Sequence, residues 1–163
     1  MIQLPPRTSD LGAETRLLLA ECRGPSYPAY NAADAKLCMQ LMHLVLSNRL
    51  KAPKRFLAAH ATLLAVITAP GQFQGFQHYP RYDSRIVHNL QTMIDIANSH
   101  HDKRPVMFAA FIRTAIEVAK GAPIRDPSPG TLAAWRTISS GSPGDDFTLF
   151  KTVAGTSFYY LSK

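Results

Sequence analysis

The chain has 163 residues, 46% of them hydrophobic and 18% charged, so its composition is that of one globular domain and excludes a disordered chain. Lys and Arg number 18 against 11 Asp and Glu, and the formal charge of +7 favours an anionic partner such as nucleic acid, anionic lipid or an acidic polymer. Apart from one small cluster the basic residues are scattered singly, without a nucleic-acid-binding motif, so we expect no nucleic-acid partner.

Two helices are predicted in the first third of the chain. Asp10 is a suitable N-cap for a helix over about 11–23, whose leucines recur near the helical period. Pro25 and Pro28 cannot continue that helix, because proline lacks a backbone N–H and clashes with the preceding turn. A second helix over about 32–50 has its leucines on one side, so we expect it to pack on a core.

A third helix is predicted over about 54–68 and leads into an unusual loop. Its second half is nearly apolar all round, so this helix should be largely buried. The loop at 70–80 reads PGQFQGFQHYP and combines two glycines with Phe73, Phe76 and several amides. Loops on a rigid scaffold often carry binding groups, which is one interpretation of this composition. The alternative is that the two phenylalanines fill the core.

The second half of the chain predicts two further helices and a small β element. One helix covers about 84–99, and another begins with Pro105 in its first turn and ends before Gly121. A short helix is expected around Trp135. The tail FTLFKTVAGTSFYYLSK is β-rich and favours a hairpin around Ala154–Gly155. The pattern therefore predicts a mainly α domain with a small β element.

The sequence lacks the motifs of several kinds of functional site. The histidines and cysteines have no zinc-ligand spacing and there is no calcium loop, so we expect no metal and no cofactor. There is no GxSxG elbow, no thiol-protease signature and no phosphate-binding glycine loop. Cys22 and Cys38 lack CxxC spacing; we expect buried free thiols, although the two could pair.

Among the few carboxylates, Glu21 has an unusual position. It follows RLLLA near the end of the first helix, where the helix dipole disfavours a negative charge by a few tenths to about 1 kcal/mol. Burial among the leucines would also favour the neutral form, as a general acid requires. The alternative is a surface ion pair between Glu21 and Arg23 or Arg16.

Four stretches occur in an order that resembles a known family. One helix ends in LLLAECRG, the next carries LVLSNR, a buried helix leads into ITAPGQFQGF, and GTSFYY comes late. This is similar to the SleB-like cell-wall hydrolases, the spore-cortex-lytic group, which show an E-A-R-G-E-like helix end, a V-x-N-R helix, a P-x-Q-F-S-type loop and a G-x-x-x-F-Y element. The resemblance covers roughly 14–80 and 154–160, and 84–150 does not align. The chain departs from the family pattern at Cys22 and Pro25.

The resemblance implies a lysozyme-like, two-lobed helical fold and a single peptidoglycan-glycosidase domain over 1–163. It also implies that Glu21 protonates the glycosidic oxygen between N-acetylmuramic acid and N-acetylglucosamine. A hydrolase would use a second carboxylate, for which Asp83 is favoured over Asp34. A lytic transglycosylase needs none, because the muramyl C6 hydroxyl attacks. The resemblance favours the transglycosylase.

The substrate in this hypothesis is a glycan strand of peptidoglycan, which requires aromatic faces for sugar rings and amides for hydroxyl and N-acetyl groups. The residues expected to supply them are Gln72, Gln74, Phe73, Phe76, Tyr27, Tyr30, Asn48, Tyr159 and Tyr160. Because side chains alternate along a strand, only one of the last two tyrosines should face the glycan. The positive charge fits the carboxylates of the peptide stems.

The start of the chain, MIQLPPRTSD, lacks the basic and apolar regions of a secretory signal. No stretch approaches the roughly 18 apolar residues of a membrane span, so we expect no stable membrane insertion. We therefore expect a protein made in the cytoplasm without a signal peptide that acts on the cell wall in the periplasm. A phage endolysin with its holin, or an antibacterial effector with a secretion machine and an immunity protein, would fit.

The competing hypothesis is a non-catalytic helical module that uses its basic surface and the 70–80 loop to bind a polymer or a partner protein. In that case Asn48 braces a loop and the phenylalanines fill the core. The enzyme hypothesis requires Glu21 to open onto the same groove as Gln72 and one of the two late tyrosines.

Overall fold

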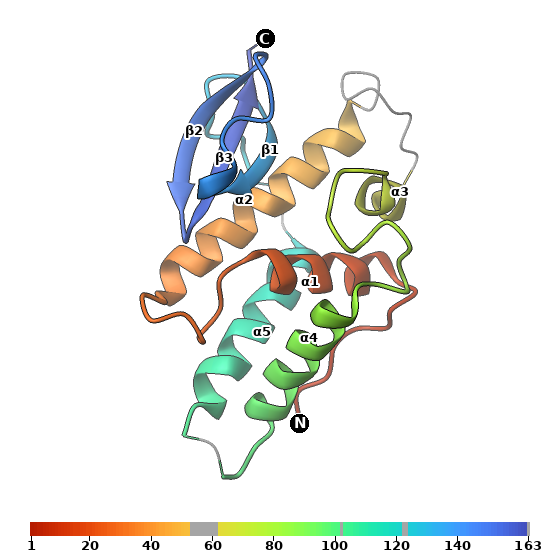
Figure 1. Ribbon diagram of the computed structural model, residues 1–163, viewed down its shortest axis with the longest axis vertical. Helices are drawn as coiled ribbons and strands as arrows, with labels where there is room; N and C mark the ends of the chain where they lie inside the picture. The colour runs from red at the N-terminus through yellow and green to blue at the C-terminus, as the bar shows by residue number, and fades with distance from the viewer. Residues whose placement is uncertain (53–61, 102, 122–123, 163) are drawn as a thin grey trace.

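The computed structural model describes residues 1–52, 62–101, 103–121 and 124–162 (Figure 1). The described chain is mainly helical, with a small antiparallel sheet near its C-terminal end. The elements in chain order are α1 (Asp10–Glu21), α2 (Ala32–Lys51), α3 (Leu63–Thr68), α4 (Ser84–Ala97), α5 (Pro105–Lys120), β1 (Thr131–Thr137), the 3-10 turn η2 (Ile138–Ser140), β2 (Phe147–Val153) and β3 (Thr156–Leu161).

Most of the predicted helices are confirmed, with small changes at their ends. α1 is capped by Ser9, whose Oγ accepts a hydrogen bond from the Gly12 N–H at 3.0 Å, so the predicted cap Asp10 is instead the first helical residue. α5 begins at Pro105 and ends before Gly121 as predicted. Of the helix predicted over 54–68, the described part is α3, and 53–61 lie outside the described residues.

The short helix predicted around Trp135 is wrong, because this residue lies in β1. The sheet order is β1-β3-β2, and Trp135 stands opposite Phe158 of the central strand. Two alanines before the tryptophan favour a helix locally, but pairing with β3 determines the structure. The predicted hairpin is confirmed: β2 and β3 are joined through Ala154 and Gly155, both with positive φ.

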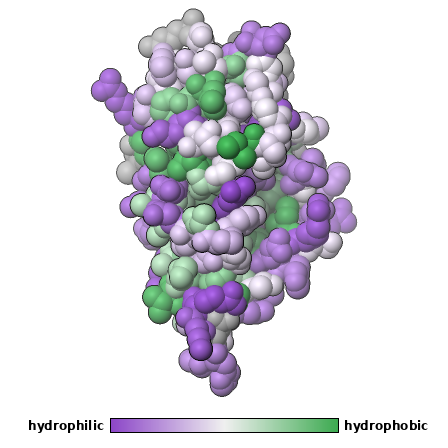
Figure 2. Space-filling model, turned by 60° about the vertical axis from the view of Figure 1, so that its left-hand side comes forward, coloured by the Kyte–Doolittle hydropathy of each residue, from purple (hydrophilic) through white to green (hydrophobic). Residues whose placement is uncertain are grey.

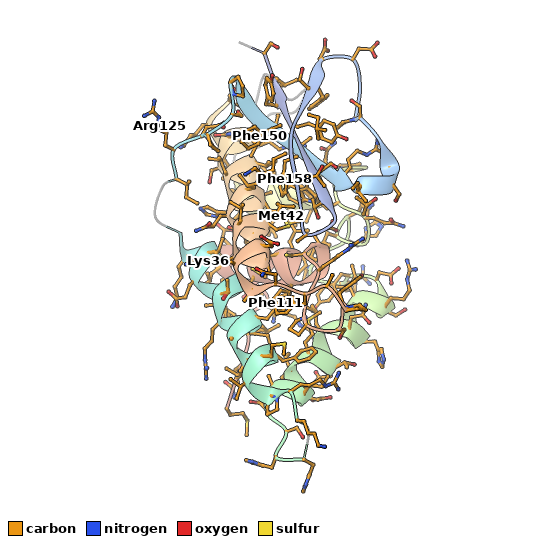
Figure 3. All side chains as sticks on the ribbon, turned by 90° about the vertical axis from the view of Figure 1, so that its left-hand side faces the viewer. Lys36, Met42, Phe111, Arg125, Phe150 and Phe158 are labelled. Atoms are coloured by element: carbon orange, nitrogen blue, oxygen red, sulfur yellow. The ribbon has the colours of Figure 1, made fainter. Side chains whose placement is uncertain are left out.

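The long helix α2 runs beside the sheet, while α4 and α5 form a separate pair at the other end of the molecule, with α1 crossing between (Figure 1). The main core lies between these layers. Met42 of α2 and Phe158 of β3 are fully buried, and half-buried Phe150 packs against the same core from β2 (Figure 3). A second, smaller core lies under the 70–80 loop and contains Phe73 and Phe76.

The face turned forward in Figure 2 carries hydrophobic residues among hydrophilic ones, with much of the green in the upper half, where the sheet lies. Leu149 of β2 exposes about half of its surface, at 54%. None of the helices in the described parts of the chain is long and apolar enough to cross a membrane.

Candidate active site

Glu21 is the last residue of α1, and its carboxyl is half-buried beside the sheet. Its Oε2 accepts a hydrogen bond from the indole Nε1 of Trp135 at 3.3 Å. Burial raises the pKa of Glu21, and the indole N–H lowers it by a smaller amount, so the pKa lies above its ordinary value. The environment therefore favours a protonated carboxyl, which is the form that a general acid uses.

The alternative of a surface ion pair at Glu21 is wrong. The guanidinium of Arg23 lies over the ring of Tyr27, 5.2 Å from its centroid. Arg16 is buried and donates to the carbonyl oxygens of Pro5 and Gly12 at 2.8 and 2.9 Å. The hydrogen-bonding partner of the Glu21 carboxyl is thus the neutral indole, and no cation of the described residues depresses its pKa.

The indole of Trp135 is held by the loop that follows α3. Its ring stacks on Phe73 with centroids 4.8 Å apart and planes 25° apart. Arg49 of α2 lies 5.7 Å from the Phe73 ring and donates to the Ala133 carbonyl at 2.9 Å and to Gln72 Oε1 at 2.5 Å. Burial lowers the pKa of Arg49 to about 10, so it remains protonated at neutral pH. The loop, α2 and β1 together fix the group that contacts Glu21.

Two cavities meet at Glu21. One, of about 240 Å³, is lined by Ala20, Glu21, Gln74, Gly75, Asp83, Arg85, Ile86 and Asn89. The other, of about 110 Å³, includes Glu21, Arg23, Gly24, Ser26, Tyr27, Asn89 and Phe108 among its lining residues. The carboxyl therefore stands where the 70–80 loop and α4 meet the segment that follows α1.

Each of these cavities has a neighbour with which it shares lining residues. A hollow of about 610 Å³ shares Gln74, Gly75 and Asp83 with the first cavity. A hollow of about 460 Å³ shares Arg23 and Tyr27 with the second cavity. We call these four hollows, each linked to the next through shared lining residues, the row of hollows, and Glu21 lines the two in its middle.

Asp83 lines the same cavity as Glu21, as a second carboxylate would. Its Oδ1 caps α4 by accepting the Arg85 backbone N–H at 2.8 Å, and the Arg85 Nε lies 3.4 Å away. These contacts, the backbone N–H first, hold the pKa of Asp83 below its ordinary value. Asp83 N–H also donates to the Gly75 carbonyl at 3.2 Å, which ties the loop to α4. Glu21 and Asp83 thus differ in the protonation that their surroundings favour.

The predicted roles of Phe73 and Phe76 as sugar-contacting faces are corrected. Phe76 is 0% exposed and Phe73 only 5% exposed, so the loop's phenylalanines fill the second core. Gln72 is exposed and reaches the network through Arg49, but Gln74 is the amide that lines the cavity beside Glu21. Gln72 lines neither of the two cavities beside Glu21, so the expectation that Glu21 and Gln72 share a groove is wrong.

The glycan contact predicted for Asn48 is not found, and the competing prediction that Asn48 braces a loop is confirmed. Asn48 donates to Asp126 Oδ2 at 2.9 Å and to the Leu132 carbonyl at 2.8 Å, so its amide braces the segment before β1. Tyr30 packs edge-on against Phe111 with centroids 5.9 Å apart, and it lines the 460 Å³ hollow beside Arg23. Of the two, Tyr30 alone lines part of the row.

Tyr159 and Tyr160 do not line the cavities that meet at Glu21. They alternate across β3, as predicted, with Tyr159 buried at 7% exposure and Tyr160 packed against the main core. The contact from the sheet to Glu21 comes instead from Trp135. The late tyrosines are thus removed from the proposed substrate-binding residues.

Three groups at the cavity were not predicted from the sequence. Trp135 was assigned to a helix, and Arg85 and Asn89 carried no motif. Gln74 was expected as one of the binding amides of the 70–80 loop, whereas Arg85 and Asn89 lie on the exposed side of α4 and are recognisable only in three dimensions.

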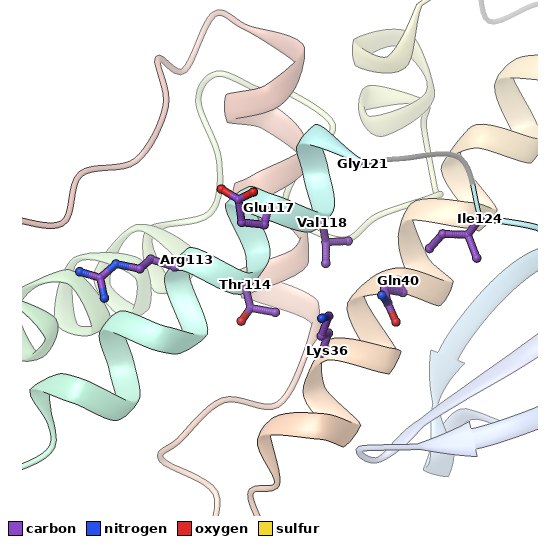
Figure 4. Close-up of a pocket in the computed structure, with 8 residues that line it drawn as sticks. All are labelled: Lys36, Gln40, Arg113, Thr114, Glu117, Val118, Gly121 and Ile124. Atoms are coloured by element: carbon purple, nitrogen blue, oxygen red, sulfur yellow. The ribbon is translucent and has the colours of Figure 1, made fainter.

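Another cavity, of about 410 Å³, lies between α2 and α5, away from Glu21 (Figure 4). Its lining residues are Lys36, Gln40, Arg113, Thr114, Glu117, Val118, Gly121 and Ile124. The one carboxylate among them, Glu117, is exposed and pairs with Lys120 at 3.3 Å. This cavity therefore lacks a desolvated acid.

The two cysteines are free, buried thiols that contact each other. The Cys22 thiol also donates to the Ala35 carbonyl at 3.5 Å. The contact with Cys22 lowers the pKa of Cys38, while that of Cys22 is raised. Across the described residues, His, Cys, Asp and Glu side chains nowhere gather in a group of three that could hold a metal.

No family model, curated protein or solved structure matches this chain. The function must therefore be argued from the geometry of the site.

Proposed function

We propose that the protein cleaves the glycan backbone of peptidoglycan, with Glu21 as the general acid and base. The observation that carries this proposal is the Glu21 carboxyl itself, which is desolvated, accepts a hydrogen bond from a neutral indole and lines two cavities. A glycosidic oxygen is a poor leaving group until it receives a proton, and a carboxyl of raised pKa supplies that proton near neutral pH.

The row of hollows supports a polymeric substrate. An extended chain needs contacts on both sides of the bond that breaks, and Glu21 lines two cavities. Gln74, Asn89 and Arg85 offer hydrogen-bonding groups for hydroxyl and N-acetyl groups on one side. The sheet and the helical pair on either side of α1 would then correspond to the two lobes of a lysozyme-like fold.

Asp83 supports the hydrolytic form of this reaction. It lines the cavity beside Glu21 and its lowered pKa keeps it ionised, so it can activate water or stabilise positive charge on the sugar. In the transglycosylase form, which the family resemblance favours, the muramyl C6 hydroxyl attacks and Asp83 takes no part. The products distinguish the two.

The test is digestion of purified peptidoglycan sacculi by the wild type, Glu21→Gln and Asp83→Asn, with products identified by mass spectrometry. We expect soluble muropeptides with reducing ends from the wild type and none from Glu21→Gln. Anhydro-muropeptides, together with full activity of Asp83→Asn, would establish the transglycosylase instead.

Two outcomes would overturn the proposal. Digestion that is unaffected by Glu21→Gln would remove Glu21 from the reaction. A folded wild type that leaves sacculi intact would favour the non-catalytic binding module. A positive result would support a cell-wall site of action, with a holin in the case of a phage endolysin or an immunity protein in the case of an antibacterial effector.

A further inference from the structure

Arg23 is a cation that lines two of the hollows. It is exposed, and among the described residues its guanidinium contacts the Tyr27 ring rather than an acid. It lines both the 110 Å³ cavity beside Glu21 and the 460 Å³ hollow next to it. A guanidinium in this position can still form a bidentate pair with an incoming carboxylate.

The β2–β3 turn holds the Arg23 side chain in place. A Cβ atom on Gly155 would lie 2.2 Å from the Cζ of Arg23, so the guanidinium packs directly on the turn. The ring of Tyr27 covers it from another side at 5.2 Å. An arginine restrained by two neighbours loses less conformational entropy when it binds a ligand.

The 460 Å³ hollow contains groups of both charges. Arg23 provides the cation, Asp34 provides the one carboxylate, and Tyr27, Tyr30 and Asn31 provide rings and an amide. Asp34 lies in the first turn of α2, where the helix dipole offsets part of its charge. The hollow therefore offers one carboxylate-binding group beside aromatic surface.

We propose that Arg23 binds a carboxylate of the substrate's peptide stem, in the hollow on the β2–β3 side of Glu21. The inference rests on the proposed function, because it takes the ligand to be peptidoglycan. It makes Arg23 a specificity-determining residue: a strand with acidic stems is held beside Glu21 and a neutral glycan of the same length is not.

The experiment measures binding to Glu21→Gln, which keeps ligands intact, by isothermal titration calorimetry. The probes are muramyl dipeptide, which carries a carboxylate, and tetra-N-acetylchitotetraose, which is neutral. The ratio compared is the affinity for muramyl dipeptide divided by the affinity for the neutral glycan. Adding Arg23→Gln should lower this ratio about tenfold, the usual effect of losing a charge-assisted pair. Arg23→Lys should restore part of the ratio because it keeps the charge.

A second pair of variants tests the site without touching Arg23. Gly155→Ala would push the guanidinium away, whereas Gly141→Ala places a methyl group where nothing lies within 4 Å. Both glycines have positive φ, 71° and 70°, so an alanine strains the backbone at each position. We expect the affinity ratio to fall in Gly155→Ala alone, with both variants folded by circular dichroism.

The outcomes separate this inference from the proposed function. If muramyl dipeptide does not bind, or if its affinity ratio is the same with Arg23→Gln, the carboxylate site is wrong even when sacculi are digested. If the ratio depends on Arg23 while sacculi remain intact, the carboxylate site stands and the proposed reaction falls.

Discussion

Helix α1 carries two desolvated carboxyl groups, and they differ in what surrounds them. Glu14 and Glu21 are separated by two helical turns, so they lie on nearly the same face. Burial is the largest cause of a raised pKa for both. Glu14, however, is 2% exposed and its Oε1 lies 2.5 Å from the Nδ1 of His43.

The partner and the access decide what each carboxyl can do. The His43 ring is closed in by Gly121, whose added Cβ would lie 2.4 Å from Nε2, and no cavity described above includes Glu14. Glu21 has an indole N–H in place of the imidazole, and two cavities open beside it. Desolvation alone thus does not identify a catalytic acid; a neutral partner and an open side distinguish it from a structural pair.

Exchanging each carboxyl for an amide should separate the two roles most strongly. Glu21→Gln should lower the rate of sacculus digestion about 100-fold or more, because an amide cannot donate the proton. Glu14→Gln should instead lower the melting temperature by about 4–8 °C, from roughly 2 kcal/mol lost at a buried pair. Digestion rates and calorimetric scans of both variants check this. A loss of digestion rate in Glu14→Gln, measured at a temperature where the variant is fully folded, would contradict it.

Removing the indole N–H should raise the pKa of Glu21 further. Trp135→Phe keeps an aromatic ring against Phe73 but loses the bond that lowers the pKa of Glu21. That pKa should rise, so the alkaline limb of kcat/KM should move to higher pH, with activity reduced about tenfold. Arg136→Ala is the matched control, since Arg136 is the next residue of β1 and donates to the Ser142 carbonyl instead. An unchanged limb in Trp135→Phe would show that the indole does not influence Glu21.

The Glu14–His43 pair should produce a smaller effect on the pH dependence of stability. The bond to Glu14 raises the pKa of His43 above its ordinary value of 6.5, so the folded protein holds this proton more tightly than the unfolded chain does. The stabilisation is complete below pH 6.5 and is lost as the pH rises through the raised value. The raised pKa of Glu14 acts in the same direction, from pH 4.5 upward.

His43→Gln should therefore flatten this part of the profile. The free energy of unfolding of the wild type should fall by about 1 kcal/mol more than that of the variant as the pH rises above 6.5. Urea titrations at several pH values measure it. A slope that is equal in the two proteins would mean that His43 does not carry the charge.

Local chemistry allowed the sequence to predict some of these features. The proline start of α5 and the turn at Gly155 depend on neighbouring residues, and so does the position of Glu21 at a helix end. Trp135 was missed because two alanines favour a helix locally, while the strand requires pairing with Phe158. The local spacing of apolar residues does not indicate which distant segments pair in a sheet.

The predicted substrate contacts failed for a related reason. The composition of the 70–80 loop indicates aromatic and amide groups but not which of them face inward, and Phe76 became core while Gln74 lines the cavity. Asn48 is an amide on a helix, and only its distance from Asp126 shows that it braces the chain. Residue type predicted the kinds of group present, whereas burial determined their roles.

The bond between Trp135 and Glu21 joins residues 114 positions apart, and this separation has a consequence for biosynthesis. A ribosome adds about 5–20 residues per second, so α1 emerges seconds before β1 does. Until the sheet is translated and docks, the carboxyl of Glu21 lacks its indole partner and the shelter of the second layer. A nascent or prematurely terminated chain would thus contain the acid without the burial that raises its pKa, and the activity proposed for Glu21 would arise only with the last strands.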